Sequence, residues 1–172
     1  MRIKHTRFDY VPLTPNTSAV NIEFETDVNN DNFKELKEVR KRHPNQFSCA
    51  CLNINSFGYA FCSAKELLTT NTVDMLMETK LDNTFINSQF AVDNYHLWRA
   101  GRNARGGGLL VYIRSDLACD RKNNLECGTI EYIFTEKNFK NRKWLICGLC
   151  IPPSLSDHLF MEDVHKTFDK FQ

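Results

Sequence analysis

The chain has 172 residues, enough for one domain or for part of a larger one. Because 42% of the residues are hydrophobic and 12% are aromatic, the composition allows a packed core and excludes a fully disordered chain. The net charge of +1 creates no global field that would draw the protein to nucleic acid or to a membrane. Any nucleic-acid binding must therefore come from a local patch.

The sequence contains no targeting or membrane segment that we can identify. Its longest apolar runs, Leu109–Ile113 and Trp144–Ile151, are far shorter than the roughly 20 residues that cross a bilayer. The basic N-terminus is not followed by an apolar stretch, so no secretory signal is visible. Seven cysteines at irregular spacing argue against a disulfide framework or a disulfide-linked partner. We expect a reducing, intracellular compartment, either the nucleus or the cytoplasm.

The first segment, residues 1–31, contains two prolines and many Asn and Thr residues without a sustained period. This composition is typical of a loosely ordered arm. Residues 32–45 form a lead-in helix that Asp31 or Asn32 would cap and Pro44 would end.

A strand–helix–strand unit is expected next. Phe47–Asn55 is predicted to be the first strand and Val73–Thr79 the second. Between them, Phe61, Ala64 and Leu68 lie on one face of a short amphipathic helix. This spacing predicts a βαβ unit with two parallel strands.

The second part of the chain reads mainly as strands. The expected strands are 95–98, 109–114, 129–135 and 143–150, with a hairpin loop at 137–141. The third of these alternates, with Ile130, Tyr132 and Phe134 on one face.

A final helix is expected to begin within Ser154–Asp157. Its apolar stripe is still complete where the sequence stops, which is not typical of a self-contained domain; the stripe consists of Phe160, Val164, Phe168 and Phe171.

Two predicted strands end in polar residues that packing does not require. Asn53 lies at the end of the first strand and Glu78 at the end of the second. Strand ends of a mostly buried sheet are where α/β enzymes place their chemistry. An amide and a carboxylate there suit a phosphate group and a hard metal ion. Each residue also has a plain structural interpretation, as a polar end to a strand, and the pattern alone leaves both open.

Three arginines, Arg99, Arg102 and Arg105, precede the glycine run 106–108. Guanidinium groups bind phosphate in a bidentate manner, and glycine allows close approach of the backbone, so this loop suits phosphate contact. The alternative is a solvated hairpin that enters a buried strand. The loop is not a Walker loop, because no Gly-Lys-Ser/Thr is present.

Cys147 and Cys150 have the Cys-x-x-Cys spacing of zinc and dithiol sites. On a strand, an offset of three residues places the two sulfurs on opposite faces. Cys49 and Cys51 are separated by one residue, so they do not supply a second pair at ligand spacing. A zinc or redox module is therefore only a third hypothesis.

Four segments in this order resemble a known family: 52–56, 73–82, 102–114 and 143–154. They are similar to the endonuclease/exonuclease/phosphatase domain at the front of non-LTR (LINE-type) retrotransposon polyproteins, and the likeness runs from about Asn32 to Gln172. The resemblance implies an α/β fold with two mixed sheets face to face and helices outside. We expect residues 46–172 to form an incomplete, truncated version of this four-layer sandwich.

The resemblance also implies divalent-metal-dependent hydrolysis of DNA phosphodiester bonds, with Mg²⁺ or Mn²⁺ as the cofactor. Asn53 matches the family's Asn that orients the phosphate or the nucleophile network. Glu78 matches its metal-binding Glu, and Arg102 matches the Arg before the Gly-rich strand. With Arg99 and Arg105, Arg102 is expected to contact DNA.

The sequence departs from the family at several positions. Cys150 stands where the family has Tyr, Gly101 where it has Asp, and 58–60 where it has Arg-Asn-Lys. The sequence stops before the family's Asp-x-Asn motif and its terminal Asp-His pair. Because these motifs supply the general base, which contributes roughly 10²–10⁴-fold, we expect the chain to be inactive alone.

We also expect truncation to expose the inner face of the first sheet and to lower stability. This expectation leads to a second hypothesis, a non-enzymatic fragment. Such a fragment would bind nucleic acid or a protein partner through the Arg/Gly loop and the exposed sheet.

Overall fold

The computed structural model describes residues 30–52, 57–79, 86–101, 108–126, 130–139, 142–151 and 154–171. Three α-helices lie in these ranges: α1 (Asn30–Arg42), α2 (Phe57–Thr69) and α3 (Asp157–Phe168). The strands are β1 (Cys49–Leu52), β2 (Met75–Thr79), β3 (Tyr95–Ala100), β4 (Leu109–Arg114), β5 (Cys119–Arg121), β6 (Glu131–Phe139) and β7 (Arg142–Cys150). Short 3₁₀ helices are η1 (Asn87–Phe90), η2 (Asn123–Leu125) and η3 (Asp169–Phe171).

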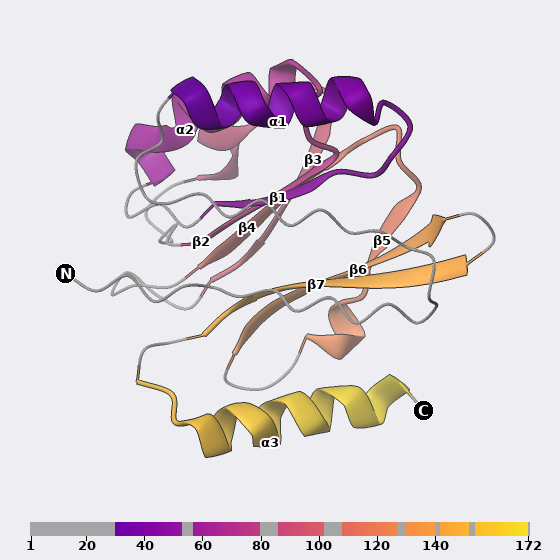
Figure 1. Ribbon diagram of the computed structural model, residues 1–172. Helices are drawn as coiled ribbons and strands as arrows, with labels where there is room; N and C mark the ends of the chain where they lie inside the picture. Colours follow the sequence, from indigo (N-terminus) through magenta and orange to yellow (C-terminus); the bar gives the residue numbers. More distant parts are fainter. Residues whose placement is uncertain are drawn as a thin grey trace.

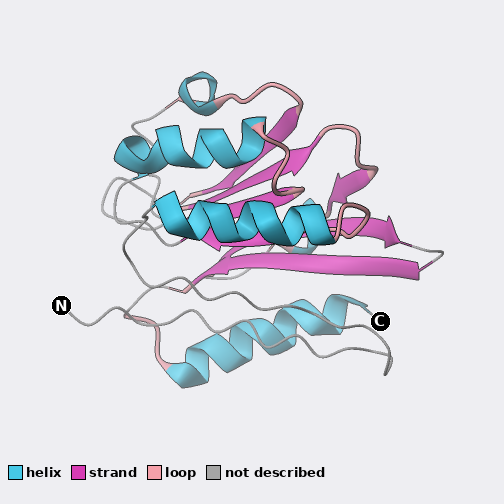
Figure 2. Cartoon of the chain, turned by 45° about the horizontal axis from the view of Figure 1, so that its top comes forward, coloured by secondary structure: helices cyan, strands magenta, loops and turns pink. Residues whose placement is uncertain are grey.

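These elements form four layers (Figures 1 and 2). The first sheet has the order β1-β2-β4-β3 and is mixed, because β1 and β2 are parallel and the other pairs antiparallel. The second sheet, β5-β6-β7, is antiparallel. Helices α1 and α2 cover the outer face of the first sheet, and α3 covers that of the second. The predicted α/β sandwich and the parallel β1–α2–β2 unit are confirmed.

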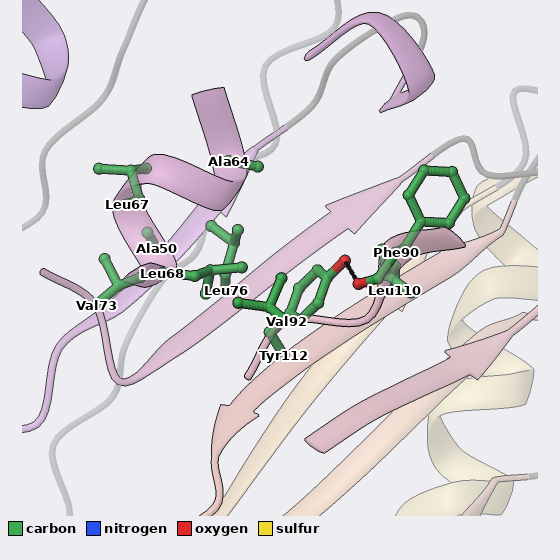
Figure 3. Packing of buried hydrophobic residues seen from close by; sticks show 10 residues of the cluster. All are labelled: Ala50, Ala64, Leu67, Leu68, Val73, Leu76, Phe90, Val92, Leu110 and Tyr112. Carbon is green, nitrogen blue, oxygen red and sulfur yellow. Dashed lines mark hydrogen bonds between the residues drawn. The ribbon is translucent and has the colours of Figure 1, made fainter. Parts of the chain in front are cut away.

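The helix-side core explains why α2 forms where it does (Figure 3). Ala64, Leu67 and Leu68 recur at helical spacing, are fully buried, and pack in one cluster with Leu76 and Leu110 of the sheet. Burial of such side chains stabilises the fold by about 1.5–3 kcal/mol each. In the same core, the Tyr112 hydroxyl donates a hydrogen bond of 2.7 Å to the Phe90 carbonyl.

The inner face of the first sheet is buried, so the predicted exposed sheet is wrong for the described residues. Met75, Val111 and Ile113 have no exposed surface, and they pack in one cluster with Ile133 of β6 and the partly buried Ile146 of β7. The reason is that β6 and β7 already form an apolar layer over them.

The edge strand β1 is the exception on this face. Cys49 and Cys51 are register partners of Met75 and Met77, yet both cysteines are exposed.

The two sheets approach closely at Gly148. A β-carbon there would lie 3.0 Å from the Met77 sulfur and 3.3 Å from a Leu109 methyl carbon. The absence of a side chain at this position therefore lets β7 sit against β2 and β4.

The outer face of the second sheet follows the predicted alternation. Ile130, Tyr132 and Phe134 are buried together, and Leu155 and Phe160 from the α3 segment pack against them. The predicted helix start is also confirmed, because the Ser156 side chain caps α3 by accepting from the Leu159 amide.

The Cys-x-x-Cys sulfurs are divided between two cores. Cys147 packs under α3, whereas Cys150 packs between the sheets. Burial raises the pKa of the Cys147 thiol to about 12, as expected for an inert structural cysteine. This arrangement confirms the predicted opposite faces and does not suit a shared zinc or redox site.

Several predicted boundaries need correction. Residues 137–139 belong to β6 rather than to a hairpin loop, because the ladder continues to the pair Phe139–Arg142. Strand β5 was not predicted, since three residues give too short a pattern to recognise. Helix α1 begins at Asn30, ahead of the predicted capping residues Asp31 and Asn32.

The predicted domain boundaries at 31 and 46 remain predictions. Residues 1–29 of the predicted arm at 1–31 lie outside the described residues. Asn53–Asn55, at the end of the first predicted strand, also lie outside them.

An ionic cluster fixes α1 to the start of β2. The buried Asp74 carboxylate accepts hydrogen bonds from the guanidinium groups of Arg40 and Arg114 and from the Ser48 amide. Arg40 also donates to the carbonyls of Gln46 and Asn71. Buried charges are stable only when paired and hydrogen-bonded in this way.

Candidate active site

The carboxyl ends of β1, β2 and β3 meet at one edge of the first sheet, where β4 begins. Leu52 pairs with Glu78, Glu78 pairs with Leu110, and Ala100 pairs with Leu109. This register places the end of each strand beside its neighbour. We call this end of the first sheet, at Leu52, Glu78, Ala100 and Leu109, the candidate edge.

All of the sequence-predicted site residues belong to segments that reach the candidate edge. Asn53 follows Leu52 directly, and Arg102 and Arg105 lie in the connection from Gly101 to Gly108. These three residues lie outside the described ranges. For Glu78 the structure describes the backbone in β2 but not the side chain. Their roles therefore remain predictions.

Arg99 is the one predicted site residue whose side chain is described. It is half-buried at the end of β3, where its Nη1 donates to Oδ1 of Asn87 at 3.0 Å. Its carbonyl accepts a hydrogen bond of 3.1 Å from Arg121 Nη2. Burial raises the pKa of Tyr112 well above its usual value, and the charge of Arg99 opposes that shift only in part. Arg99 therefore makes hydrogen bonds with Asn87 and Arg121, and its contact with DNA remains a prediction.

Glu131 is a residue of the candidate edge that sequence reasoning missed. Its side chain is buried, and its Oε2 accepts a hydrogen bond of 3.0 Å from the Gly108 amide. Gly108 has a φ of 117°, a conformation that favours glycine. Glu131 therefore joins the second sheet to the residue where the Arg/Gly connection enters β4. The alternation of Ile130, Tyr132 and Phe134 was the available signal, since it directs Glu131 toward the other sheet.

One of the positions that depart from the family, Cys150, also lies near this edge. Cys150 pairs with Glu131 across the β6–β7 ladder and packs in the core between the sheets. A thiol there lacks the reach and the hydroxyl of the tyrosine that the family resemblance would place at this position.

The described residues do not by themselves form a metal site. Among them, no group of three His, Cys, Asp or Glu side chains is arranged to hold a metal ion. The oxygen donors of Asn53 and Glu78 have the right chemistry for Mg²⁺ or Mn²⁺, but they contribute a single carboxylate. Metal binding at this edge therefore remains a proposal.

Two further findings concern membranes and disulfides. Within the described ranges, no helix has both the length and the apolar character needed to cross a bilayer. Among the cysteines that the structure describes, Cys49, Cys51, Cys62, Cys119 and Cys147 are free thiols.

Comparison with known proteins identifies the fold. No family model and no curated protein sequence matches the chain. Among solved structures, the chain is similar to the endonuclease domain of TRAS1, a telomere-specific non-LTR retrotransposon (TM-score 0.52, 8% identity, 73% of this chain and 55% of that chain).

Two structures of TDP2 from D. rerio are also similar. One is a form humanized by 14 mutations (TM-score 0.47, 10% identity, 73% of this chain and 57% of that chain). The other is complexed with a single-strand DNA product (TM-score 0.49, 9% identity, 73% of this chain and 54% of that chain).

The TRAS1 likeness establishes the fold, and at 8% identity it establishes nothing further. The chain has the endonuclease/exonuclease/phosphatase fold that its motifs predicted. It spans little more than half the length of these structures: 57%, 55% and 54%.

Proposed function

We propose that the chain carries part of a divalent-metal-dependent DNA endonuclease site of the non-LTR retrotransposon type. The supporting observation is the register of the candidate edge, where Leu52 pairs with Glu78. Asn53 follows Leu52, so the two residues that match the family's phosphate and metal residues belong to adjacent strand ends. Ligands of α/β sheets commonly bind at such an edge.

Each residue has a distinct role in this proposal. Glu78 supplies a carboxylate oxygen for Mg²⁺ or Mn²⁺, and Asn53 orients the phosphate. A divalent cation held there would supply polarisation of the phosphoryl group for attack by water. Arg102 and Arg105, together with Arg99, contact backbone phosphates, because guanidinium groups match phosphate geometry. We propose that the protein acts on DNA in the nucleus or the cytoplasm.

We further infer that the 172-residue polypeptide does not cleave DNA by itself. As the family resemblance implies, Gly101 replaces the acidic partner of Arg102, and Cys150 replaces a tyrosine whose hydroxyl faces the phosphate. A single carboxylate also makes a weak Mg²⁺ site.

The second candidate function is DNA binding without cleavage through the Arg/Gly connection. It is favoured by the location of that connection, which joins β3 to β4 at the candidate edge. The buried inner face of the first sheet takes no part in it.

Plasmid nicking with Mg²⁺ separates these possibilities, with Glu78→Ala as the matched variant. We expect no nicking by the parent chain above the level of the variant. DNA binding should be present and should weaken steeply with salt, and Arg102→Ala with Arg105→Ala should reduce the salt slope by about two. Lys41 is an exposed cation on α1, and Lys41→Ala is the control. This variant should change neither the DNA affinity nor its salt slope.

The outcomes are distinct. Nicking that Glu78→Ala abolishes would establish the endonuclease site and overturn the inferred inactivity. Salt-dependent binding without nicking is the expected result for an incomplete site, and it would leave DNA binding as the activity of the chain. The absence of both would contradict the assignment of this edge to DNA.

A further inference from the structure

A basic hollow lies at the opposite end of the second sheet from the candidate edge. It is an open surface depression of about 420 Å³, lined by residues of β6, β7, the η2 segment and η3. Figure 1 shows where these elements lie. The two ends of β7 define this separation. Cys150 pairs with Glu131, which binds Gly108 at the candidate edge, whereas Trp144 pairs with Lys137 toward the hairpin turn.

Three lysines from three separate segments line the hollow: Lys122, Lys143 and Lys170. The amines of Lys122 and Lys143 both reach Oε1 of Glu136, at 3.2 and 3.7 Å. Lys170 Nζ donates to the Asn124 carbonyl at 3.4 Å. These contacts hold the three ammonium groups around one space.

The charge of the lining is unbalanced. Three lysines face one carboxylate, that of Glu136, which leaves an excess of two positive charges. Asp120 lies opposite Glu136 in the β5–β6 ladder but does not line the hollow. An anion with several oxygens would therefore gain more from these lysines than Glu136 alone provides.

The lining also has an apolar part. Leu125 is buried, Leu145 is 38% exposed, and both line the hollow together with Trp144. The hollow is open to solvent, so a ligand there would lie against the lysines on one side and this apolar surface on the other. Inorganic phosphate makes no use of an apolar wall, whereas a nucleotide has both a phosphate and a flat base.

We propose that this hollow binds a nucleotide, with its phosphate among Lys122, Lys143 and Lys170 and its base against Leu145. The nucleotide is either free or the 5′-terminal residue of a strand, since the phosphate chemistry is the same. The site is independent of the proposed endonuclease function, because its residues lie at the far end of the sheet.

The test is titration of the ¹⁵N-labelled chain with thymidine 5′-phosphate, followed by NMR. We expect shifts of the amide signals of Leu145, Asn124 and Lys170. Inorganic phosphate and unphosphorylated thymidine should each bind more weakly. A 5′-phosphorylated (dT)₆ that binds more tightly than thymidine 5′-phosphate would identify the strand end as the source, and equal affinity would identify the free nucleotide.

Two variants with opposite expected effects make the test specific. Lys143→Ala removes an exposed amine and should weaken binding roughly threefold to tenfold. Glu136→Gln releases two lysines and should tighten binding, an effect that a merely structural role would not produce. Lys166→Ala, an exposed lysine of α3 paired with Glu162, is the matched control and should leave the affinity unchanged.

Circular dichroism of each variant checks that the fold is retained. Shifts that persist unchanged in Lys143→Ala, or weaker binding by Glu136→Gln, would overturn the proposal. Inorganic phosphate that binds as tightly as thymidine 5′-phosphate would overturn the assignment to a nucleotide.

Discussion

Strand β2 has an acidic residue near each end, and we assign the two residues different roles. At its start, Asp74 receives hydrogen bonds from Arg40, Arg114 and Ser48, so its charge is used to hold α1 against the sheet. At the other end, the described backbone places Glu78 between Leu52 and Leu110 in the ladder, where we propose that it binds a metal ion. The position of an acidic residue at a strand end does not by itself decide its role, and for Asp74 the hydrogen-bonded partners decide it.

The largest expected effect tests the Asp74 end. Asp74→Ala leaves two partly buried guanidinium groups and the Ser48 amide without their acceptor, so we expect it to lower the free energy of unfolding by about 3 kcal/mol. Urea denaturation measures this change. Asp116→Ala removes an exposed partner of Arg114 and should cost less than about 1 kcal/mol. Equal effects of the two substitutions would show that Asp74 is not a structural anchor.

A smaller effect is expected at the candidate edge, where Glu131 holds Gly108. Glu131→Ala leaves the Gly108 amide buried without this acceptor and should lower the free energy of unfolding by about 2 kcal/mol. Glu131→Gln keeps a carbonyl oxygen in reach and should recover most of that loss. If the Gln and Ala variants were equally unstable in urea, the hydrogen bond to Gly108 would not be the reason for the burial of Glu131.

The contact between the sheets near the candidate edge gives a third prediction. Gly148→Val places methyl groups against Met77 and Leu109, and overpacking of this kind should lower the free energy of unfolding by about 1.5 kcal/mol. The loss should be smaller when Met77→Ala provides space, which a double-mutant cycle in urea measures. Additive effects would contradict the close approach of the two sheets.

The smallest expected effect is a pH dependence at the Asp74 end. Tyr95 donates a 2.6 Å hydrogen bond to the Val73 carbonyl, and burial raises its pKa to about 12. The unfolded chain then loses this proton near pH 10 while the folded protein keeps it, so stability falls as the pH rises from 10 toward 12. At pH 11 we expect a loss of about 1 kcal/mol from this residue.

Tyr95→Phe is the matched variant for this pH dependence. Urea denaturation at pH 9 and pH 11 should show a smaller decrease for Tyr95→Phe than for the parent chain. Identical decreases would mean that another group titrates in this range.

Most of the fold was predictable because its elements have strong local patterns. The strand β4 is an apolar run, and its predicted first and last residues, Leu109 and Arg114, were both correct. The outward face of β6 followed from Ile130, Tyr132 and Phe134. The length of β6 was underestimated because Lys137 and Asn138 resemble turn residues, whereas the ladder with β7 includes them.

The packing of the two sheets was not predictable in the same way. The expected exposed face rested on the length of the sequence relative to the family, and no local pattern reports which strands lie opposite one another. Ile133 and Ile146 cover that face from 20 or more residues away along the chain.

The candidate edge was predictable in part. Asn53 and Glu78 stand out because polar residues end apolar strands, and the register places their strand ends side by side. Glu131 was missed because a single carboxylate in an apolar strand resembles a solvent-facing residue until its face is known. Asp74 was missed for a related reason, since its partners Arg40 and Arg114 are far from it in the sequence.

The most direct test of the account is where a divalent cation binds. Mn²⁺ broadens the amide NMR signals of nearby residues, so titration of the ¹⁵N-labelled chain locates its site. We predict broadening at Leu52, Thr79, Ala100 and Gly108 that Glu78→Ala removes, with the signals around Asp74 unaffected. Two results would contradict the assignment of Asp74 to structure and of Glu78 to metal binding. One is broadening centred on Asp74, and the other is broadening at the candidate edge that persists in Glu78→Ala.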